Sequence, residues 1–235
     1  MPEPRAVVLD VDGTIVDSVY QHTFAWSRAF RKAGHPVEAW RIHRHIGMGG
    51  DKLVPALAGE DVEESSGDRI REIWEAEYDA VVGDVGLLDD AQELLVALRD
   101  RGIRVALASS SIPKHAQHAF DLIDADWYAD LTTTSEDAAE SKPDRELVAV
   151  AMQRLGTGNA LMVGDAVWDV VAASHAGIPT IGLCCGGYGR HELLDAGAVE
   201  VYLGPGDLLA HLDLALEIGF GLSQRASVSG GPSTR

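Results

Sequence analysis

Short runs of apolar residues alternate along most of this chain with longer segments of mixed polarity. Uniformly apolar runs of four residues stand at 6–9, 105–108 and 160–163. A short apolar run that stops at polar residues is typical of a buried parallel strand. We also expect strands at 180–183 and 199–203, and a short one at 127–128, where Trp and Tyr are adjacent.

The segments between these runs place apolar residues at the spacing of an amphipathic helix. In the segment 89–101, for example, Leu94, Leu95 and Leu98 share one face. The sequence predicts helices at 18–33, 37–45, 51–57, 63–82, 89–101, 113–122, 144–155, 167–176 and 207–218. Strands that alternate with helices of this length predict a parallel sheet with right-handed crossovers.

One part of the chain, residues 17–83, departs from this rhythm because it contains helical patterns and no convincing strand. We interpret it as an inserted helical cap, so that the core comprises residues 1–16 and 84–222. Residues 223–235 are rich in Ser, Gly and Pro without an apolar period, and we expect a disordered tail there. The predicted fold class is α/β: a Rossmann-like parallel sheet with helices on both faces, plus the inserted α-helical cap subdomain.

The net charge changes the expectation about partners. The chain has 235 residues, with 37 acidic against 19 basic ones and a formal charge of −18. A protein this negative is expected to bind neither nucleic acid nor an anionic membrane. Lysine is scarce, so a site for phosphate has to concentrate its positive charge locally. The charge does not distinguish a monomer from a dimer.

The cysteines and the lengths of the apolar runs indicate where in the cell the protein is expected. Cys184 and Cys185 are adjacent, and adjacent cysteines rarely form a disulfide without strain. We expect two buried apolar thiols on a strand, in a protein of the reducing cytoplasm. The sequence contains no signal-peptide core and no apolar run of membrane-spanning length, which also favours a cytoplasmic location.

Polar side chains that suit phosphoryl transfer stand at the ends of three expected strands, and a lysine precedes the helix before the last of them. The set comprises Asp10, Asp12, Ser109, Lys142, Asp165 and Asp169. Carboxyl ends of parallel strands share one edge of the sheet, where ligands of α/β proteins bind. Carboxylates gathered there favour a hard divalent cation. Taken singly, each residue also fits an ordinary cap, turn or surface position, so the combination carries the interpretation.

Four motifs stand in order along the chain: Asp-x-Asp-Gly-Thr at 10–14, the strand-terminal Ser109, Lys-Pro at 142–143 and Gly-Asp-x-x-x-Asp at 164–169. This set resembles the haloacid dehalogenase superfamily, over residues 6–216. The insert resembles the helical cap of the subgroup that contains phosphoglycolate phosphatase and β-phosphoglucomutase. The resemblance implies a Mg²⁺-dependent phosphatase that hydrolyses a small phosphorylated metabolite, phosphoglycolate-like or sugar-phosphate-like, through an aspartyl-phosphate.

The resemblance also implies a role for each motif residue. Asp10 is expected to be the nucleophile, and Asp12 to protonate the leaving oxygen and then activate water. Ser109 and the amide of Ser110 are expected to hold phosphate oxygens. Lys142 is expected to neutralise the charge of the nucleophile and the phosphoryl group.

The resemblance further implies that Mg²⁺ binds Asp10, the main-chain carbonyl of Asp12, and Asp165, with Asp169 in support. Candidates for contact with the substrate are Thr14 and, in the cap, His22, Gly47, Met48 and Gly49. A histidine here also fits a surface or hinge position. The glycines fit a flexible connector as well as a loop that approaches a ligand closely.

Two other functions stay open. A β-phosphoglucomutase-like phosphotransferase is favoured by His22 and Trp26, which resemble the first cap helix of the mutase. However, Gly50 stands where the mutase has an arginine for a second phosphate. The fourth motif reads Val163-Gly164-Asp165, whereas the mutase carries an acid before the metal aspartate. A phospho-accepting signalling module also combines acids, a hydroxyl and a lysine on a parallel sheet, but it is much shorter and lacks a helical insert.

Overall fold

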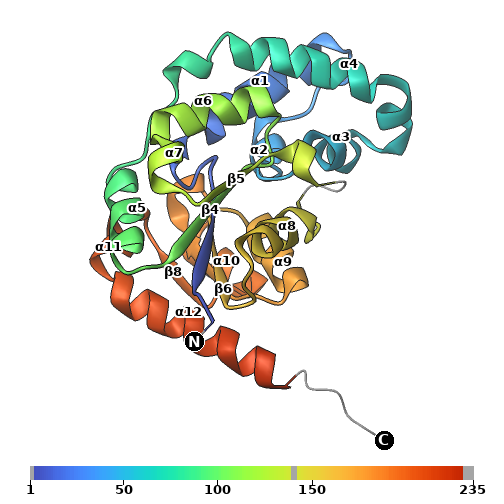
Figure 1. Cartoon of the computed structure of the whole chain (residues 1–235). Helices are drawn as coiled ribbons and strands as arrows, with labels where there is room; N and C mark the ends of the chain where they lie inside the picture. The colour runs from blue at the N-terminus through green and yellow to red at the C-terminus, as the bar shows by residue number, and fades with distance from the viewer. Residues whose placement is uncertain (1–2, 139–141, 230–235) are drawn as a thin grey trace, which may run out of the picture.

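Six parallel strands form the sheet at the centre of the computed structural model, which describes residues 3–138 and 142–229. Their order is β5-β4-β1-β6-β7-β8, so β1 is central (Figure 1). The strands are β1 Ala6–Asp10, β4 Arg104–Ala108, β5 Leu131–Thr133, β6 Ala160–Gly164, β7 Thr180–Leu183 and β8 Glu200–Tyr202. The predicted α/β class with a parallel sheet is confirmed.

Helices cover both faces of the sheet because β1 is apolar on both. The helices that follow residue 87 are α5 Ala91–Asp100, α6 Pro113–Ile123, α7 Ala125–Tyr128, α8 Glu146–Leu155, α9 Val167–Ala176, α10 Arg190–Ala196, α11 Pro205–Ala210 and α12 Leu212–Ser229. Val7 and Leu9 belong to one hydrophobic cluster, which includes residues of α5 and α12. Ala6 and Val8 belong to a second cluster with residues of α8 and α9. The alternation of side chains along a strand separates the two clusters.

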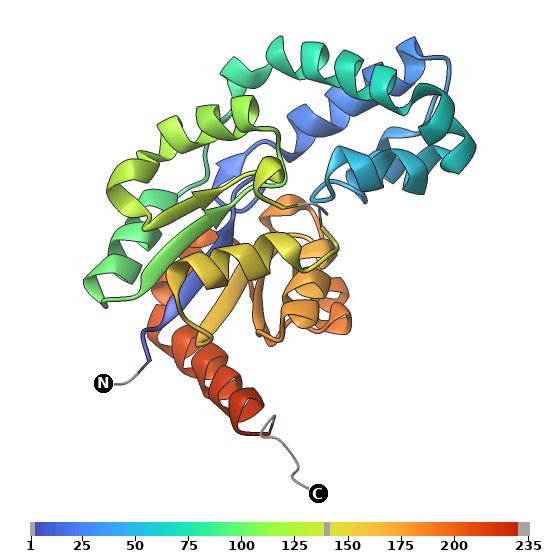
Figure 2. The same cartoon turned by 45° about the vertical axis from the view of Figure 1, so that its right-hand side comes forward.

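Between β1 and β4 the chain leaves the sheet and forms a helical block. Its helices are α1 Val19–Lys32, α2 Ala39–His43, α3 Gly50–Ala58 and α4 Glu60–Asp79. α4 packs against α1 and α3, and the block lies beyond the carboxyl ends of the central strands (Figures 1 and 2). The chain enters and leaves it through two short antiparallel strands, β2 (Val16–Asp17) and β3 (Gly86–Leu87). The helices lie within the range 17–83, whose standing as a separate subdomain stays a prediction.

The structure differs from the sequence prediction at residues 127–128 and in the tail. Residues 127–128 belong to α7, and the strand begins at Leu131, where the chain pairs with β4. Trp127 is 68% exposed, so this pair of aromatic residues lacks the burial that a strand of the sheet requires. The expected tail overlaps α12, which continues to Ser229 because Phe220 and Ser223 are still buried against the molecule. Residues 230–235 lie outside the described part of the chain.

Among the helices described, none combines the length and the apolar character needed to cross a bilayer.

Candidate active site

The first two acids diverge at the end of β1. Asp10 is the last residue of the strand, and Gly13, with a φ of +86°, bends the chain directly after it. The turn is closed by a bond of 2.8 Å from the Gly13 amide to the carbonyl oxygen of Val16. As a result the Asp10 carboxylate meets the acids that follow β6, whereas the Asp12 carboxylate meets hydroxyls and a histidine.

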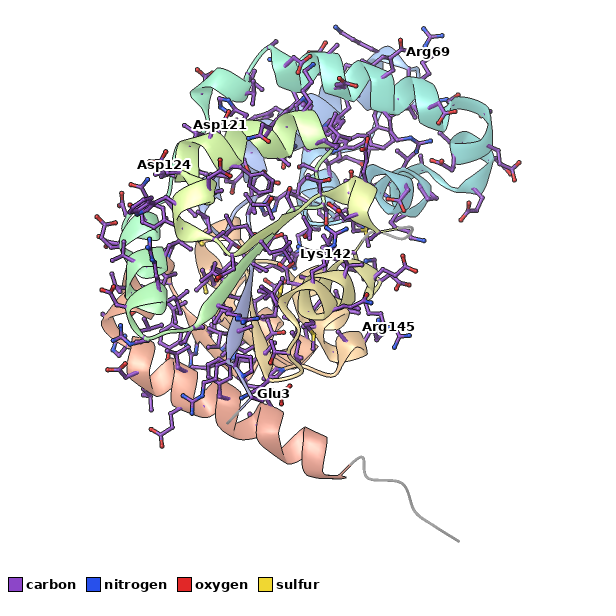
Figure 3. The ribbon with its side chains drawn as sticks, in the orientation of Figure 1. Glu3, Arg69, Asp121, Asp124, Lys142 and Arg145 are labelled. Atoms are coloured by element: carbon purple, nitrogen blue, oxygen red, sulfur yellow. The ribbon has the colours of Figure 1, made fainter. Side chains whose placement is uncertain are left out.

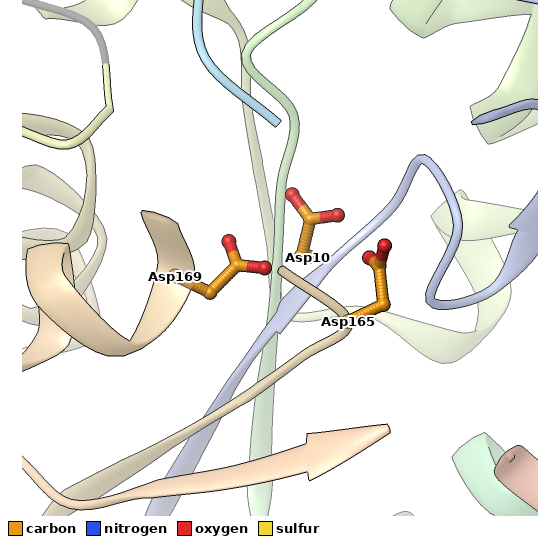
Figure 4. A group of neighbouring side chains, drawn as sticks. All are labelled: Asp10, Asp165 and Asp169. Atoms are coloured by element: carbon orange, nitrogen blue, oxygen red, sulfur yellow. The ribbon is translucent and has the colours of Figure 1, made fainter. Parts of the chain in front are cut away.

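Asp10 belongs to a cluster of three buried carboxylates. One oxygen from each of Asp10, Asp165 and Asp169 lies within 4.8 Å of the others, and the three side chains come from β1, the loop after β6 and the first turn of α9 (Figure 4). Burial raises the pKa of Asp10 to about 7, although Lys142 opposes the rise. Burial and the charge of Asp10 also raise the pKa of Asp165. Such a set of hard oxygen donors fits a divalent cation such as Mg²⁺, which would offset their repulsion.

Lys142 supplies the positive charge at this edge of the sheet. Lys142 lies in the segment before α8 (Figure 3), and its side chain is fully buried. The ammonium group donates to Asp10, and it lies 2.7 Å from an oxygen of Asp169. Burial alone would lower the pKa of Lys142, but Asp10 and Asp169 raise it above its usual value. The ammonium therefore stays charged beside the expected nucleophile.

Asp12 is hydrogen-bonded by side chains at the start of the helical block and by side chains that follow β4. Ser18 and Ser111 donate their hydroxyls to it at 2.7 and 2.9 Å, Ser109 donates at 3.1 Å, and a ring nitrogen of His22 lies 3.1 Å away. Burial would raise the pKa of Asp12, but His22 and the hydroxyl donors outweigh it and lower the pKa. The carboxylate is therefore ionised in this arrangement.

Ser18 and Ser111 were not among the residues predicted from the sequence. Ser111 had a signal in the run of three serines that follows β4, whereas Ser18 had none beyond its place before α1. Ser109 is fully buried and binds Asp12, while Ser110 lines the cavity described below. The Ser110 hydroxyl oxygen is buried and has no hydrogen-bond partner among the described residues.

Thr14 lies beside the Asp165 carboxylate. It is fully buried and is not among the residues that line the cavity; its hydroxyl donates to Asp165 at 2.7 Å. Its contribution is to hold the Asp165 carboxylate in place. The Thr14 side chain is therefore directed to Asp165 and not to the cavity, and its contact with a substrate stays a prediction.

Glycine allows two loops to touch the Asp165 carboxylate. A Cβ atom on Gly186 would lie 1.7 Å from Asp165 Oδ2, and one on Gly13 would lie 2.6 Å from the same oxygen. Between these contacts the Cys185 thiol donates to the carbonyl oxygen of Gly13 at 3.0 Å. The adjacent cysteines thus lie in a turn after β7, and not on the strand as expected.

A cavity of about 40 Å³ lies between the sheet and the helical block. Its residues are Asp10, Asp12, Ser110 and Ser111 from the sheet and His22, Trp26, Ile46, Gly47, Met48, Gly50 and Trp74 from the block. The structure therefore places His22, Gly47 and Met48 at the cavity, and their contact with a substrate stays a prediction. Gly49 instead lines an adjoining groove of about 410 Å³.

The comparison with known proteins identifies the family. The model of the haloacid dehalogenase-like hydrolases matches residues 4–177. The chain belongs to this family. It is also similar to a hydrolase of known structure from Pseudomonas syringae, with a TM-score of 0.85 and 34% identity over 89% of this chain and 98% of the other.

Two curated relatives are named as phosphatases. A phosphoglycolate phosphatase of Rhodospirillum rubrum is 29% identical over 85% of this chain and 87% of its own length. A validoxylamine A 7'-phosphate phosphatase of Streptomyces hygroscopicus subsp. limoneus is 24% identical over 76% of this chain and 85% of its own length. The resemblance to the superfamily and the prediction of a hydrolase are confirmed, and these names agree with a phosphoric monoester hydrolase.

Proposed function

We propose that the protein is a Mg²⁺-dependent phosphatase that hydrolyses a small phosphate monoester through an aspartyl-phosphate on Asp10. The observation that carries the proposal is the convergence of Asp165, Asp169 and Lys142 on Asp10, at a cavity that Asp12 also lines. The relatives named as phosphatases support the same reaction.

In the first step a carboxylate oxygen of Asp10 attacks phosphorus, and the bond to the leaving oxygen breaks. Lys142 reduces the repulsion between this carboxylate and the phosphate. Asp10, Asp165 and Asp169 would hold Mg²⁺, which would supply positive charge to offset the charge of the phosphoryl group. The Ser110 hydroxyl, which lacks a partner among the described residues, is available to a phosphate oxygen.

Asp12 transfers the proton. It protonates the leaving oxygen in the first step and accepts a proton from the attacking water in the second, which frees Asp10 and releases phosphate. Because Asp12 is ionised in the arrangement described above, it needs a proton before it acts as an acid. His22, with a ring nitrogen 3.1 Å from Asp12 Oδ1, is the side chain placed to provide one.

One contact in the helical block supports hydrolysis over a mutase reaction. A Cβ atom on Gly50 would lie 3.1 Å from the ring of Trp26. A long side chain that reached toward a second phosphate from this position would have to displace the indole. We therefore do not propose the mutase reaction, and the family match gives no support to a signalling module.

The test is release of inorganic phosphate from p-nitrophenyl phosphate and from a panel of phosphate monoesters, with Mg²⁺ and with EDTA. We expect many turnovers per protein molecule with Mg²⁺ and none with Asp10→Asn. Asp195→Asn, which changes an exposed aspartate, is the matched control and is expected to behave as wild type. Full turnover by Asp10→Asn would exclude the mechanism, and a single phosphorylation per chain would favour the signalling module.

Three predictions about the setting stay predictions. They are a cytoplasmic location, a monomeric or dimeric state, and the absence of nucleic-acid and membrane partners at a formal charge of −18.

A further inference from the structure

We propose that Trp168 and Tyr188 are positioning residues of the reaction, because they hold the loop of the helical block that lines the cavity beside Asp10. Both side chains donate to the same main-chain oxygen, the carbonyl oxygen of Arg44, at 3.2 and 2.5 Å. Residues 46–48, which follow directly, line the cavity. The inference rests on the proposed phosphatase function and adds the side chains that place the leaving group.

The first observation is that both donors are fixed in the core. Tyr188 is 3% exposed and belongs to a hydrophobic cluster with Val170 of α9 and Leu193 of α10. Trp168, in the first turn of α9, packs against the same cluster. The two hydrogen bonds therefore tie a loop of the helical block to a rigid part of the molecule.

The second observation is that the side chains around Arg44 reinforce these bonds. The Arg44 guanidinium lies 3.8 Å from the centre of the Tyr188 ring and forms an ion pair with Glu192. A ring nitrogen of His43 lies 3.0 Å from the carbonyl oxygen of Gly186. The segment before the loop is thus fastened to the core by its main chain and by its side chains.

The third observation concerns Gly47, which lets the loop lie directly against α9. Its φ is +100°, and an added Cβ atom would lie 3.1 Å from the Ala166 Cβ atom and 3.3 Å from the Trp168 ring. Trp168 therefore contacts the segment at two places, the carbonyl oxygen of Arg44 and the backbone of Gly47. A loop held at two places has little freedom to shift in the cavity.

The place of the two donors in the chain connects the loop to the reacting groups. Trp168 directly precedes Asp169, and Tyr188 stands two residues after Gly186, whose backbone packs against Asp165. The same short segments thus set the position of the carboxylates and of the loop across the cavity. Precise placement matters because a displacement of about 1 Å can cost about 10²-fold in rate.

The shared acceptor makes the two donors partly redundant. A carbonyl oxygen has two lone pairs, so the oxygen of Arg44 keeps one partner when either donor is removed. Removal of both Trp168 and Tyr188 as donors leaves this oxygen without either bond, and an unpaired buried oxygen is costly. The double variant is therefore expected to lose more than the sum of the single variants.

The first test measures hydrogen exchange in Trp168→Phe, Tyr188→Phe and the double variant, which keep an aromatic ring at each position. Amides within residues 45–48 donate to main-chain carbonyl oxygens, so they exchange when the segment opens. We expect exchange to accelerate at least about tenfold in the double variant and less than about threefold in each single one. Wild-type exchange in the double variant would overturn the inference, as would equal acceleration at Gly34 and His35, which close α1 in the same block.

The second test separates placement of the leaving group from support of the phosphate site. With p-nitrophenyl phosphate and Mg²⁺, the double variant is expected to raise KM at least about tenfold and to change kcat much less. The inhibition constant of inorganic phosphate should stay within about threefold of the wild-type value, because phosphate has no leaving group. An unchanged KM, or an inhibition constant that rises as much as KM, would overturn the positioning role.

The matched control is Trp40→Phe/Tyr202→Phe, which makes the same two changes away from the cavity and is expected to behave as wild type. If the double variant does not fold, Arg44→Gln replaces it, since this change removes the guanidinium from Tyr188 and Glu192 but keeps the carbonyl oxygen. It is expected to accelerate exchange within residues 45–48 and to raise KM, and no change in either would overturn the inference.

The two readouts also distinguish the possible failures. If the wild-type protein does not turn over p-nitrophenyl phosphate, the proposed function falls, and the positioning role falls with it. If turnover is present and the exchange of residues 45–48 is unaffected in the double variant, the proposed function stands and only this inference is overturned.

Discussion

Substitution of Gly186 by alanine is expected to weaken metal binding without altering any charged group. The new Cβ atom would lie 1.7 Å from Asp165 Oδ2, whereas real Cβ contacts essentially never fall below 3.0 Å. Either the turn or the carboxylate therefore has to move by more than 1 Å. The carboxylate has little freedom, because Thr14 binds it at 2.7 Å and Gly13 packs against its other oxygen.

The expected loss of Mg²⁺ affinity follows from the proposed role of Asp165 as a metal ligand. A change in the groups that hold a metal ligand in place typically lowers metal affinity by about 10- to 100-fold, which corresponds to about 1.4 to 2.7 kcal/mol. We expect the Mg²⁺ concentration for half-maximal activity to rise by this factor in Gly186→Ala. At saturating Mg²⁺ much of the activity is expected to return.

The assay is a Mg²⁺ titration of p-nitrophenyl phosphate hydrolysis, with thermal unfolding to show that the variant is folded. Gly83→Ala is the matched control, since nothing lies within 4 Å of its added Cβ atom. A folded Gly186→Ala with the wild-type Mg²⁺ dependence would refute the reasoning, because Asp165 would then tolerate displacement or not bind the metal.

Three further predictions concern other groups of the site. Asp12→Asn is expected to slow single-turnover cleavage of ethyl phosphate by about 10²- to 10⁴-fold but to affect p-nitrophenyl phosphate, whose leaving group needs no proton, much less; equal losses would contradict the acid role. Lys142→Met leaves Asp10 and Asp169 without their buried cation. Urea unfolding without Mg²⁺ should therefore show a free energy of unfolding lower by about 3 kcal/mol or more, and a free energy equal to that of the wild type would contradict the pairing. Burial, opposed by Asp79, lowers the pKa of His115, so folding disfavours the charged form of this side chain. The stability of the protein should therefore fall as the pH drops below about 6.5. Melting temperatures measured from about pH 8 to about pH 5 should show a smaller pH dependence in His115→Gln.

The sequence predicted the structure correctly where the type of a residue and its place on a strand are enough to determine its environment. The run 6–9 and the acids after it gave the central strand and one end of the site, because burial on both faces leaves only apolar residues in such a strand. Lys142 was predicted from the Lys-Pro motif and from its place before the helix that leads to the strand of Asp165, and it is buried against Asp10 and Asp169.

The rest depended on contacts between distant segments. Gly186 touches Asp165 and Ser18 binds Asp12 only after the chain has folded, and neither residue type reveals such a partner. Thr14 belongs to the recognised motif, yet its side chain points into the protein, which a motif does not specify. The stacked pair of Trp26 and Trp74 joins two helices of the block, and helical spacing accounted for both as ordinary core residues.

The two short strands that join the helical block to the sheet have a consequence for how such enzymes diversify. Asp17 and Gly86 are paired across the β2–β3 ribbon, so the two ends of the block are neighbours although 69 positions separate them in sequence. A block whose two ends are adjacent can be replaced or shortened while the strands of the six-stranded sheet keep their register. The exchange is constrained by Ser18 and His22, which travel with the block and bind Asp12. A replacement block has to bring its own hydrogen-bond donors for the Asp12 carboxylate, so any exchange of the block also changes the surroundings of this acid.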